Sequence, residues 1–170
     1  MSLKRIPFDS LTLMAICREL QTAVGSRIQR IVKLDDWTIA LNIHGMGKTS
    51  WLLFSVHPEF ARVHFMESKP DSAVTADDFA RLLRNHIEGA RIKSCQMVGL
   101  DRILRIQLQR ADEPPILLVA ELMGKHSNLI LVSAEQRILA CAKPVGATKS
   151  SRVVLVGRSF EPPPHPKRES

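Results

Sequence analysis

The stretch RIQRIVKLDDWTIALNIHGMGKTSWLLFSV, residues 27–56, decides the fold class because its apolar residues recur at alternate positions. The apolar residues from Trp37 to Ile43 alternate with Thr38, Ala40 and Asn42, and this period of two is typical of a strand. The Asp-Asp pair at 35–36 predicts the turn of one hairpin, and HGMG at 44–47 predicts the turn of the next. Together with RVHFM at 62–66, the stretch predicts a four-stranded antiparallel meander.

Helical periodicity precedes this meander. Apolar residues between Leu13 and Val24 recur at i, i+3, i+4 and i+7, which is the spacing of one helix face. Asp9 or Ser10 can cap this helix at its N-terminus, and Gly25 is expected to end it.

A second helix is expected after the meander, with an apolar stripe from Phe79 to Ile87 that includes His86. Thr75 and Asp78 have the spacing of a capping box at its start, and Gly89 is its natural end. The opposite face carries two arginines one turn apart, Arg81 and Arg84, which we expect to point to solvent.

Short strands account for most of the remaining sequence. In the first strand, Ile28, Val32 and Leu34 share one parity and are expected on one face. Further strand-like segments lie at 91–98, 102–109, 116–122, 129–132, 137–142 and 152–156. Their connections are too short for parallel crossovers, which need a dozen or more residues. The expected fold class is therefore α+β: a mostly antiparallel β-sandwich or flattened barrel with two packed helices. It fills residues 1–160, and the proline-rich EPPPHPKRES at 161–170 is expected to be a linker or tail.

Composition narrows the class of partner. The chain has 170 residues, enough for one domain, and a formal net charge of +7, which favours a polyanionic partner. Its three cysteines are far apart and odd in number, which argues against a disulfide framework and for a reducing cytoplasm. The longest apolar runs, such as ILLVA at 116–120, are too short to span a bilayer, so no membrane partner is expected.

The positive charge is concentrated in residues 81–110. Seven basic residues lie there against Glu88 and Asp101, a net charge of +5. Arg81, Arg84 and Arg105 of this cluster are candidate nucleic-acid contacts. The alternative is a solvated face that serves only solubility.

Motifs for catalysis or metal binding are weak. GMGKTS at 45–50 is reminiscent of a phosphate-binding loop, but Asn42 stands where that motif needs its first glycine, and two strands flank it. The six histidines have no ligand spacing with one another or with a cysteine, and His86 on the apolar stripe is expected to be a core residue. We therefore expect no metal, no cofactor and no enzymatic activity.

Two polar clusters interrupt otherwise apolar strands. Asp101 and Arg102 stand at the start of a strand, where a guanidinium can reach a phosphate or a base; alternatively, the two side chains form a local salt bridge in the turn. ELMGKHSN at 121–128 presents Lys125 and His126, which can contact RNA, although its polar side chains can equally satisfy the backbone of a turn.

Six stretches of the chain together resemble the N-terminal domain of the NFACT family. They are IPFDSLTLMAICREL, HPEFARVHF, FARLLRNHIEGARI, VGLDRILRI, ELMGKHSNLILV and GRSFEPPP. The resemblance covers residues 6–164 in the family's order. The family includes bacterial proteins named fibronectin-binding protein A and the eukaryotic nuclear export mediator factor. Its full-length members continue into helix-hairpin-helix modules, a coiled coil and a second RNA-binding domain, so the chain is expected to be part of a longer protein.

The resemblance implies a role in ribosome quality control. Family members bind large ribosomal subunits obstructed by a peptidyl-tRNA and recruit charged tRNA, so that the stalled chain is extended without a template. The family's Asp-Arg pair for tRNA recruitment aligns with Asp101-Arg102, and its early acidic residue aligns with Asp9, which can also be a simple helix cap.

The resemblance also extends to the N-terminal domain of formamidopyrimidine-type DNA glycosylases. Their chemistry is not expected here, because it needs an N-terminal proline, whereas Pro7 is internal. Two alternatives remain open: a surface adhesin that binds fibronectin, and a vestigial glycosylase-like domain that binds nucleic acid.

Overall fold

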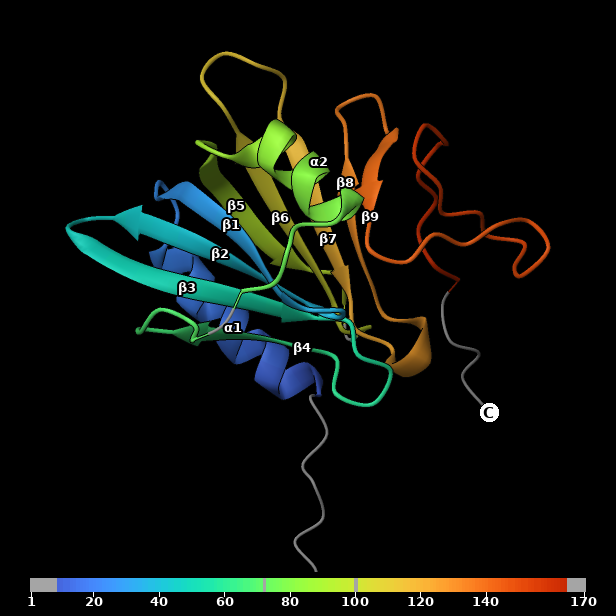
Figure 1. Ribbon diagram of the computed structural model, residues 1–170, viewed down its shortest axis with the longest axis horizontal. Coiled ribbons are helices and arrows are strands. Elements are labelled where there is room, and N and C mark those ends of the chain that lie inside the picture. The colour runs from blue at the N-terminus through green and yellow to red at the C-terminus, as the bar shows by residue number, and fades with distance from the viewer. Residues whose placement is uncertain (1–8, 72, 100, 165–170) are drawn as a thin grey trace, which may run out of the picture.

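The computed structural model describes residues 9–71, 73–99 and 101–164, so that residues 6–8 of the first family motif and 165–170 of the expected linker lie outside the described residues. The predicted meander is confirmed (Figure 1). Its strands are β1 (Arg27–Asp35), β2 (Thr38–Gly45), β3 (Lys48–Ser55) and β4 (Arg62–Met66). Its turns fall where Asp35-Asp36 and the HGMG stretch predict them.

Five more strands continue the same antiparallel sheet. They are β5 (Arg91–Met97), β6 (Ile103–Gln109), β7 (Ile116–Glu121), β8 (Asn128–Val132) and β9 (Ile138–Cys141). The described strands form one nine-stranded sheet in the order β4-β3-β2-β1-β5-β6-β7-β8-β9. Its two halves are joined where β1 pairs with β5 at Arg27 and Arg91, and inward side chains from both halves share one apolar core. The expected α+β class is confirmed, with a single folded sheet as its form.

The expected strand at 152–156 is wrong. Only Val154 pairs there, through two backbone hydrogen bonds of 2.9 Å with Val145. Pro144 and Gly146 flank Val145, so the partner segment is poorly suited to continue a ladder. The side chain of Val154 instead helps to cover an apolar cluster on the outer face of the second half of the sheet.

The expected parity of β1 is also wrong, because the strand contains a β-bulge. Ile28 pairs with Ile43 and Arg30 with Asn42, so the register shifts between Ile28 and Arg30. The shift puts Ile31, rather than Val32, into the main core with Ile28. Val32 packs in a smaller cluster on the other face of the sheet, because one extra residue reverses every later side chain in the strand.

Two α-helices pack on the folded sheet. Helix α1 (Ser10–Thr22) lies against β4 and β5, and helix α2 (Asp78–Ile87) lies against β1 and β9. Figure 1 shows α2 in front of the sheet and α1 behind it. Each helix therefore spans two strands that are not neighbours in the sheet, and closes one open corner of the shared core.

The cap of α2 differs from the one expected. Asp77, not Thr75, is the N-cap residue, and its side chain accepts a hydrogen bond of 2.9 Å from the Ala80 N–H. The other carboxylate oxygen of Asp77 lies 3.0 Å from Lys33 Nζ, which is also 4.0 Å from Asp36. Partial burial opposes ionisation of Asp77, but the bonds from Ala80 and Lys33 outweigh it and lower the pKa of the carboxyl group.

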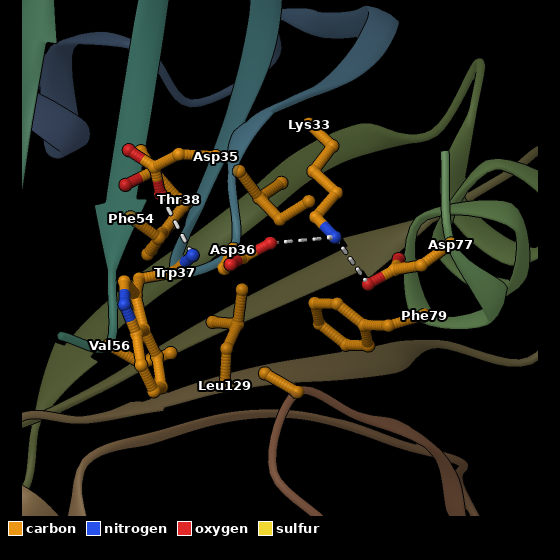
Figure 2. Close-up of a pocket in the computed structure, with 12 residues that line it drawn as sticks. Lys33, Asp35, Asp36, Trp37, Thr38, Phe54, Val56, Asp77, Phe79 and Leu129 are labelled. Atoms are coloured by element: carbon orange, nitrogen blue, oxygen red, sulfur yellow. Dashed lines mark hydrogen bonds and ion pairs between the residues drawn. The ribbon is translucent and has the colours of Figure 1, made fainter. Parts of the chain in front are cut away.

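Lys33 connects the β1–β2 turn to the start of α2 through its ion pairs with Asp36 and Asp77. Figure 2 shows Lys33 between Asp36 and Asp77, above a small cavity of about 20 Å³. Val56 and Leu129 line the cavity, so it lies where the two halves of the sheet approach each other. The turn is thereby held at a fixed place beside the ends of β8 and β9.

The β2–β3 hairpin offers a test of local strain. Its two central residues, Met46 and Gly47, have φ of +52° and +73°, and the Met46 side chain is 95% exposed. Asparagine followed by glycine is preferred in a turn with two positive φ values, whereas methionine is strained there. We expect Met46→Asn to raise the free energy of unfolding by about 0.5–1 kcal/mol, measured by urea denaturation. A lower urea concentration at the midpoint of unfolding would contradict this account of the turn.

Candidate nucleic-acid interface

Much of the basic cluster at 81–110 serves the fold. Four of its seven basic residues bond within the chain: Arg84 Nε to the Ile31 carbonyl at 3.0 Å, Arg91 to the Gly25 carbonyl at 2.9 Å, Arg110 to the Asn85 carbonyl at 3.1 Å, and Arg81 to the Asp78 carboxylate. Arg84 is half-buried, so the expectation that it points freely to solvent is wrong. Arg105 is half-buried on β6, on the face away from the main core. A role of these arginines in RNA binding stays a prediction.

A second set of basic residues surrounds a cleft of about 520 Å³. We call it the basic cleft; the lysine, arginine and histidine residues that line it are Lys125, His126, Lys143, Lys149 and Arg152. It lies between the 3-10 helix η1 (Gly124–His126) and the loop that follows β9. The sequence singles out Lys125 and His126, but it misses the other three, because they lie in a loop that no periodicity places beside η1.

The polar residues after η1 hold the cleft wall in place. Ser127 Oγ accepts from the Met123 N–H at 2.9 Å, and Asn128 Nδ2 donates to the Lys143 carbonyl at 2.8 Å. Asn128 Oδ1 accepts from the N–H groups of Leu129 and Lys143, both at 2.9 Å. These two side chains thus satisfy the backbone, as the turn interpretation predicts, while Lys125 and His126 are exposed.

A buried ion pair closes the back of the cleft. Glu121 is fully buried, and its carboxylate accepts two hydrogen bonds from the Arg152 guanidinium, at 2.8 and 2.7 Å. Arg152 Nε also donates to the Glu161 carbonyl at 2.8 Å. Pro163 and Pro164, in the segment expected to be a linker, line the cleft. Arg152 therefore ties the segment after β9 to the end of β7.

The Asp-Arg pair lies beside this cleft. Asp101 and Arg102 belong to the turn between β5 and β6, and both are half-buried. The Arg102 carbonyl accepts from the Leu122 N–H at 3.0 Å, so the turn abuts the residue that follows Glu121. Arg102 has a φ of +55°, which costs an L-residue other than glycine about 1–2 kcal/mol.

Asp9 has a structural role that the sequence predicts. Its carboxylate caps α1, accepting from the Thr12 N–H at 2.9 Å and from the Thr12 hydroxyl at 3.0 Å. These hydrogen bonds stabilise the charged form and lower the pKa of Asp9.

The direction of α1 brings its first turn toward the Asp-Arg pair. The N–H of Gly25, just after the helix, donates to the carbonyl of Ile92, near the start of β5. Earlier in the helix, Cys17 Sγ lies 3.4 Å from Cys95 Sγ, near the end of β5. The helix and the strand are thus antiparallel, and Asp9 lies toward the end of the domain that carries the β5–β6 turn.

The described residues contain neither a group of metal ligands nor a helix suited to cross a membrane. Across residues 9–71, 73–99 and 101–164, no three His, Cys, Asp or Glu side chains are grouped so that they can hold a metal ion. Within that same part of the chain, no helix combines the length and apolar character needed to cross a membrane.

Comparison with known proteins agrees with this architecture. A sequence family described as the NFACT N-terminal and middle domains matches residues 9–170. A Streptococcus suis protein named Rqc2 homolog RqcH is 35% identical over 164 residues, which cover 92% of this chain and 30% of the relative. The human ribosome quality control complex subunit NEMF is 26% identical over 133 residues, which cover 78% of this chain and 12% of that protein.

A solved structure has the same fold. The N-terminal region of the fibronectin/fibrinogen-binding protein from Streptococcus suis is 34% identical and superposes with a TM-score of 0.87 over 94% of this chain and 62% of that one. The family match covers nearly the whole chain, and the chain spans about 30% of the length of the RqcH relative. The chain therefore belongs to the NFACT family, whose members include proteins named as ribosome quality control factors.

Proposed function

We propose that this domain binds RNA on behalf of a ribosome quality control factor. Its ligands are tRNA and the large ribosomal subunit obstructed by a peptidyl-tRNA, and it recruits charged tRNA for template-free extension of the stalled chain. The domain binds and positions RNA in the cytoplasm, and the ribosome makes the peptide bond. One observation carries the proposal: the backbone hydrogen bond from Leu122 to Arg102 joins the Asp-Arg turn to the segment whose residues Glu121 and Met123 line the basic cleft.

The basic cleft and the neighbouring Asp-Arg turn offer complementary chemistry to an RNA. Exposed Lys125 and Lys149 can neutralise phosphates without reading sequence. The Arg102 guanidinium offers a planar fork for a phosphate or a guanine edge, and the Asp101 carboxylate can accept from a base amino group or a ribose hydroxyl. The cleft would supply affinity, while the Asp-Arg turn would supply orientation.

Salt dependence tests this proposal. We expect the chain to bind tRNA with an affinity that falls as salt rises, with a log-log slope of about −0.7 to −0.9 for each phosphate contact. Lys125→Ala combined with Lys149→Ala should reduce the slope by about two contacts in a fluorescence-anisotropy titration. Lys48→Ala, in the β2–β3 hairpin, is the matched control. Binding that does not respond to salt, or that is equal for a neutral polymer, would refute the electrostatic interface.

Fibronectin binding is a second candidate function, because the similar Streptococcus suis structure is described as a fibronectin/fibrinogen-binding protein. Immobilised fibronectin should capture the chain if this candidate holds, and the Lys125, Lys149 double variant then shows whether the basic cleft takes part.

A further inference from the structure

Three ring side chains gather at the loop tips next to the basic cleft. Trp37, in the β1–β2 turn, meets His57 edge-on with ring centroids 5.7 Å apart. The rings of His57 and Phe60 are tilted by 34°, with centroids 5.0 Å apart. Trp37 is 38% exposed and Phe60 is 42% exposed, so the outer rings of the cluster present area to solvent. The chain has only two tryptophans and no tyrosine, which makes this concentration notable.

The rings line a groove that is held by local hydrogen bonds. The groove has a volume of about 520 Å³, and Arg62 and His64 from β4 also line it. The backbone N–H of Trp37 donates a hydrogen bond of 2.8 Å to the Asp35 carboxylate, which fixes the turn. His57 Nδ1 accepts from the Glu59 N–H at 3.0 Å, which fixes its tautomer and its ring. The ring surfaces are therefore organised before any ligand arrives.

Lys143 links the groove to the basic cleft. Its ammonium lies 5.1 Å from the centre of the ring of Trp37, which lines the groove, and Lys143 itself is one of the residues that line the cleft. A Cβ built on Gly124 of the cleft wall would lie 3.8 Å from the Pro58 carbonyl, which shows how closely η1 approaches the loop that carries His57 and Phe60. A ligand in the cleft can therefore extend onto the rings without leaving the surface.

We propose that Trp37, His57 and Phe60 form a stacking site for an unpaired nucleobase of an RNA whose phosphates lie in the basic cleft. The inference rests on the proposed RNA-binding function and adds a subsite to it. Proteins that bind single-stranded nucleic acids commonly combine a cationic groove that follows the backbone with aromatic rings on which the bases stack. The cations Lys143 and Arg62, near the rings, favour a ligand with phosphates over a purely apolar peptide.

The test compares two RNAs of equal length: an adenine-rich single strand, and the same backbone with abasic positions. Phe60→Ala should weaken binding of the adenine-rich RNA by about 5- to 100-fold and leave binding of the abasic RNA unchanged. Phe60→Tyr should restore the affinity, because it keeps a ring. Met46→Ala, which removes an exposed apolar side chain at the far end of β2, should change neither.

Intrinsic fluorescence gives an independent readout, because Trp51 is only 4% exposed while Trp37 is accessible. In Trp51→Phe protein, the adenine-rich RNA should quench the fluorescence of Trp37, and the abasic RNA should not. Equal binding of both RNAs by every variant, with no quenching, would overturn the stacking site and leave the RNA-binding function standing. If neither single-stranded RNA binds while tRNA does, the stacking site fails alone; if tRNA does not bind either, the proposed function fails with it.

Discussion

Replacing Arg102 with glycine is expected to weaken tRNA binding by about 10- to 100-fold while making the domain slightly more stable. The loss of affinity is that of one charge-assisted hydrogen bond, worth about 1.5–3 kcal/mol. The gain in stability follows from the φ of +55°, a conformation that glycine adopts without steric cost. A relief of about 1 kcal/mol raises the melting temperature of a domain of this size by about 2–4 °C.

Two further variants separate charge from geometry at this turn. Arg102→Lys keeps the charge but loses the planar fork of donors, so it should bind tRNA poorly if the contact is bidentate, and normally if it is simple attraction. Asp101→Ala combined with Arg102→Ala should bind tRNA poorly and remain folded. A thermal melt and tRNA co-purification, run on the same preparations, provide both measurements.

The competing account treats Asp101 and Arg102 as a structural pair. In that case Arg102→Gly lowers the melting temperature, and binding falls only in proportion to the unfolded fraction. A well-folded Arg102→Gly protein that recovers as much tRNA as the unmodified chain would contradict a role of this pair in tRNA binding.

Local patterns were enough to predict most of the fold. The alternation from Trp37 to Ile43 predicts a strand, and β2 lies there between β1 and β3. The Asp9 cap could also be predicted, because it depends only on the first turn of α1. The bulge in β1 could not be seen, because Gln29 and Arg30 are both polar and no local signal marks the extra residue. The failed strand at 152–156 depends on its partner, in which Pro144 and Gly146 leave only Val145 to pair.

The site was harder to predict than the fold because long-range contacts assemble it. Residues 81–110 are rich in positive charge, but several arginines there bond to carbonyl groups from other elements, such as Ile31 and Gly25. In contrast, Lys143 and Lys149 lie in a loop without periodicity and reach η1 only through the folded sheet. The Trp37–His57–Phe60 cluster joins two loops, so no single window of sequence contains it.

Breaking the buried ion pair is expected to have the largest effect on stability. Arg152→Met leaves the fully buried Glu121 carboxylate without the guanidinium that binds both its oxygens. Loss of one partner of a buried pair costs about 3–5 kcal/mol, which corresponds to a melting temperature lower by about 6–20 °C for a domain of this size. Arg81→Met removes an exposed ion pair with Asp78 and is the matched control, with an expected cost of about 0–1 kcal/mol.

The double variant Glu121→Leu, Arg152→Met separates the two roles of Arg152. It removes the buried charge together with its partner, so most of the lost stability should return, because a well-packed apolar pair is often as stable as a buried ion pair. If the restored protein still binds tRNA weakly, the Arg152 guanidinium contributes to RNA binding beyond its part in the fold. If binding returns with stability, Arg152 acts by holding the segment after β9, and with it Lys149, against the cleft. A single Arg152→Met variant as stable as the unmodified chain would contradict the role of this pair in the fold.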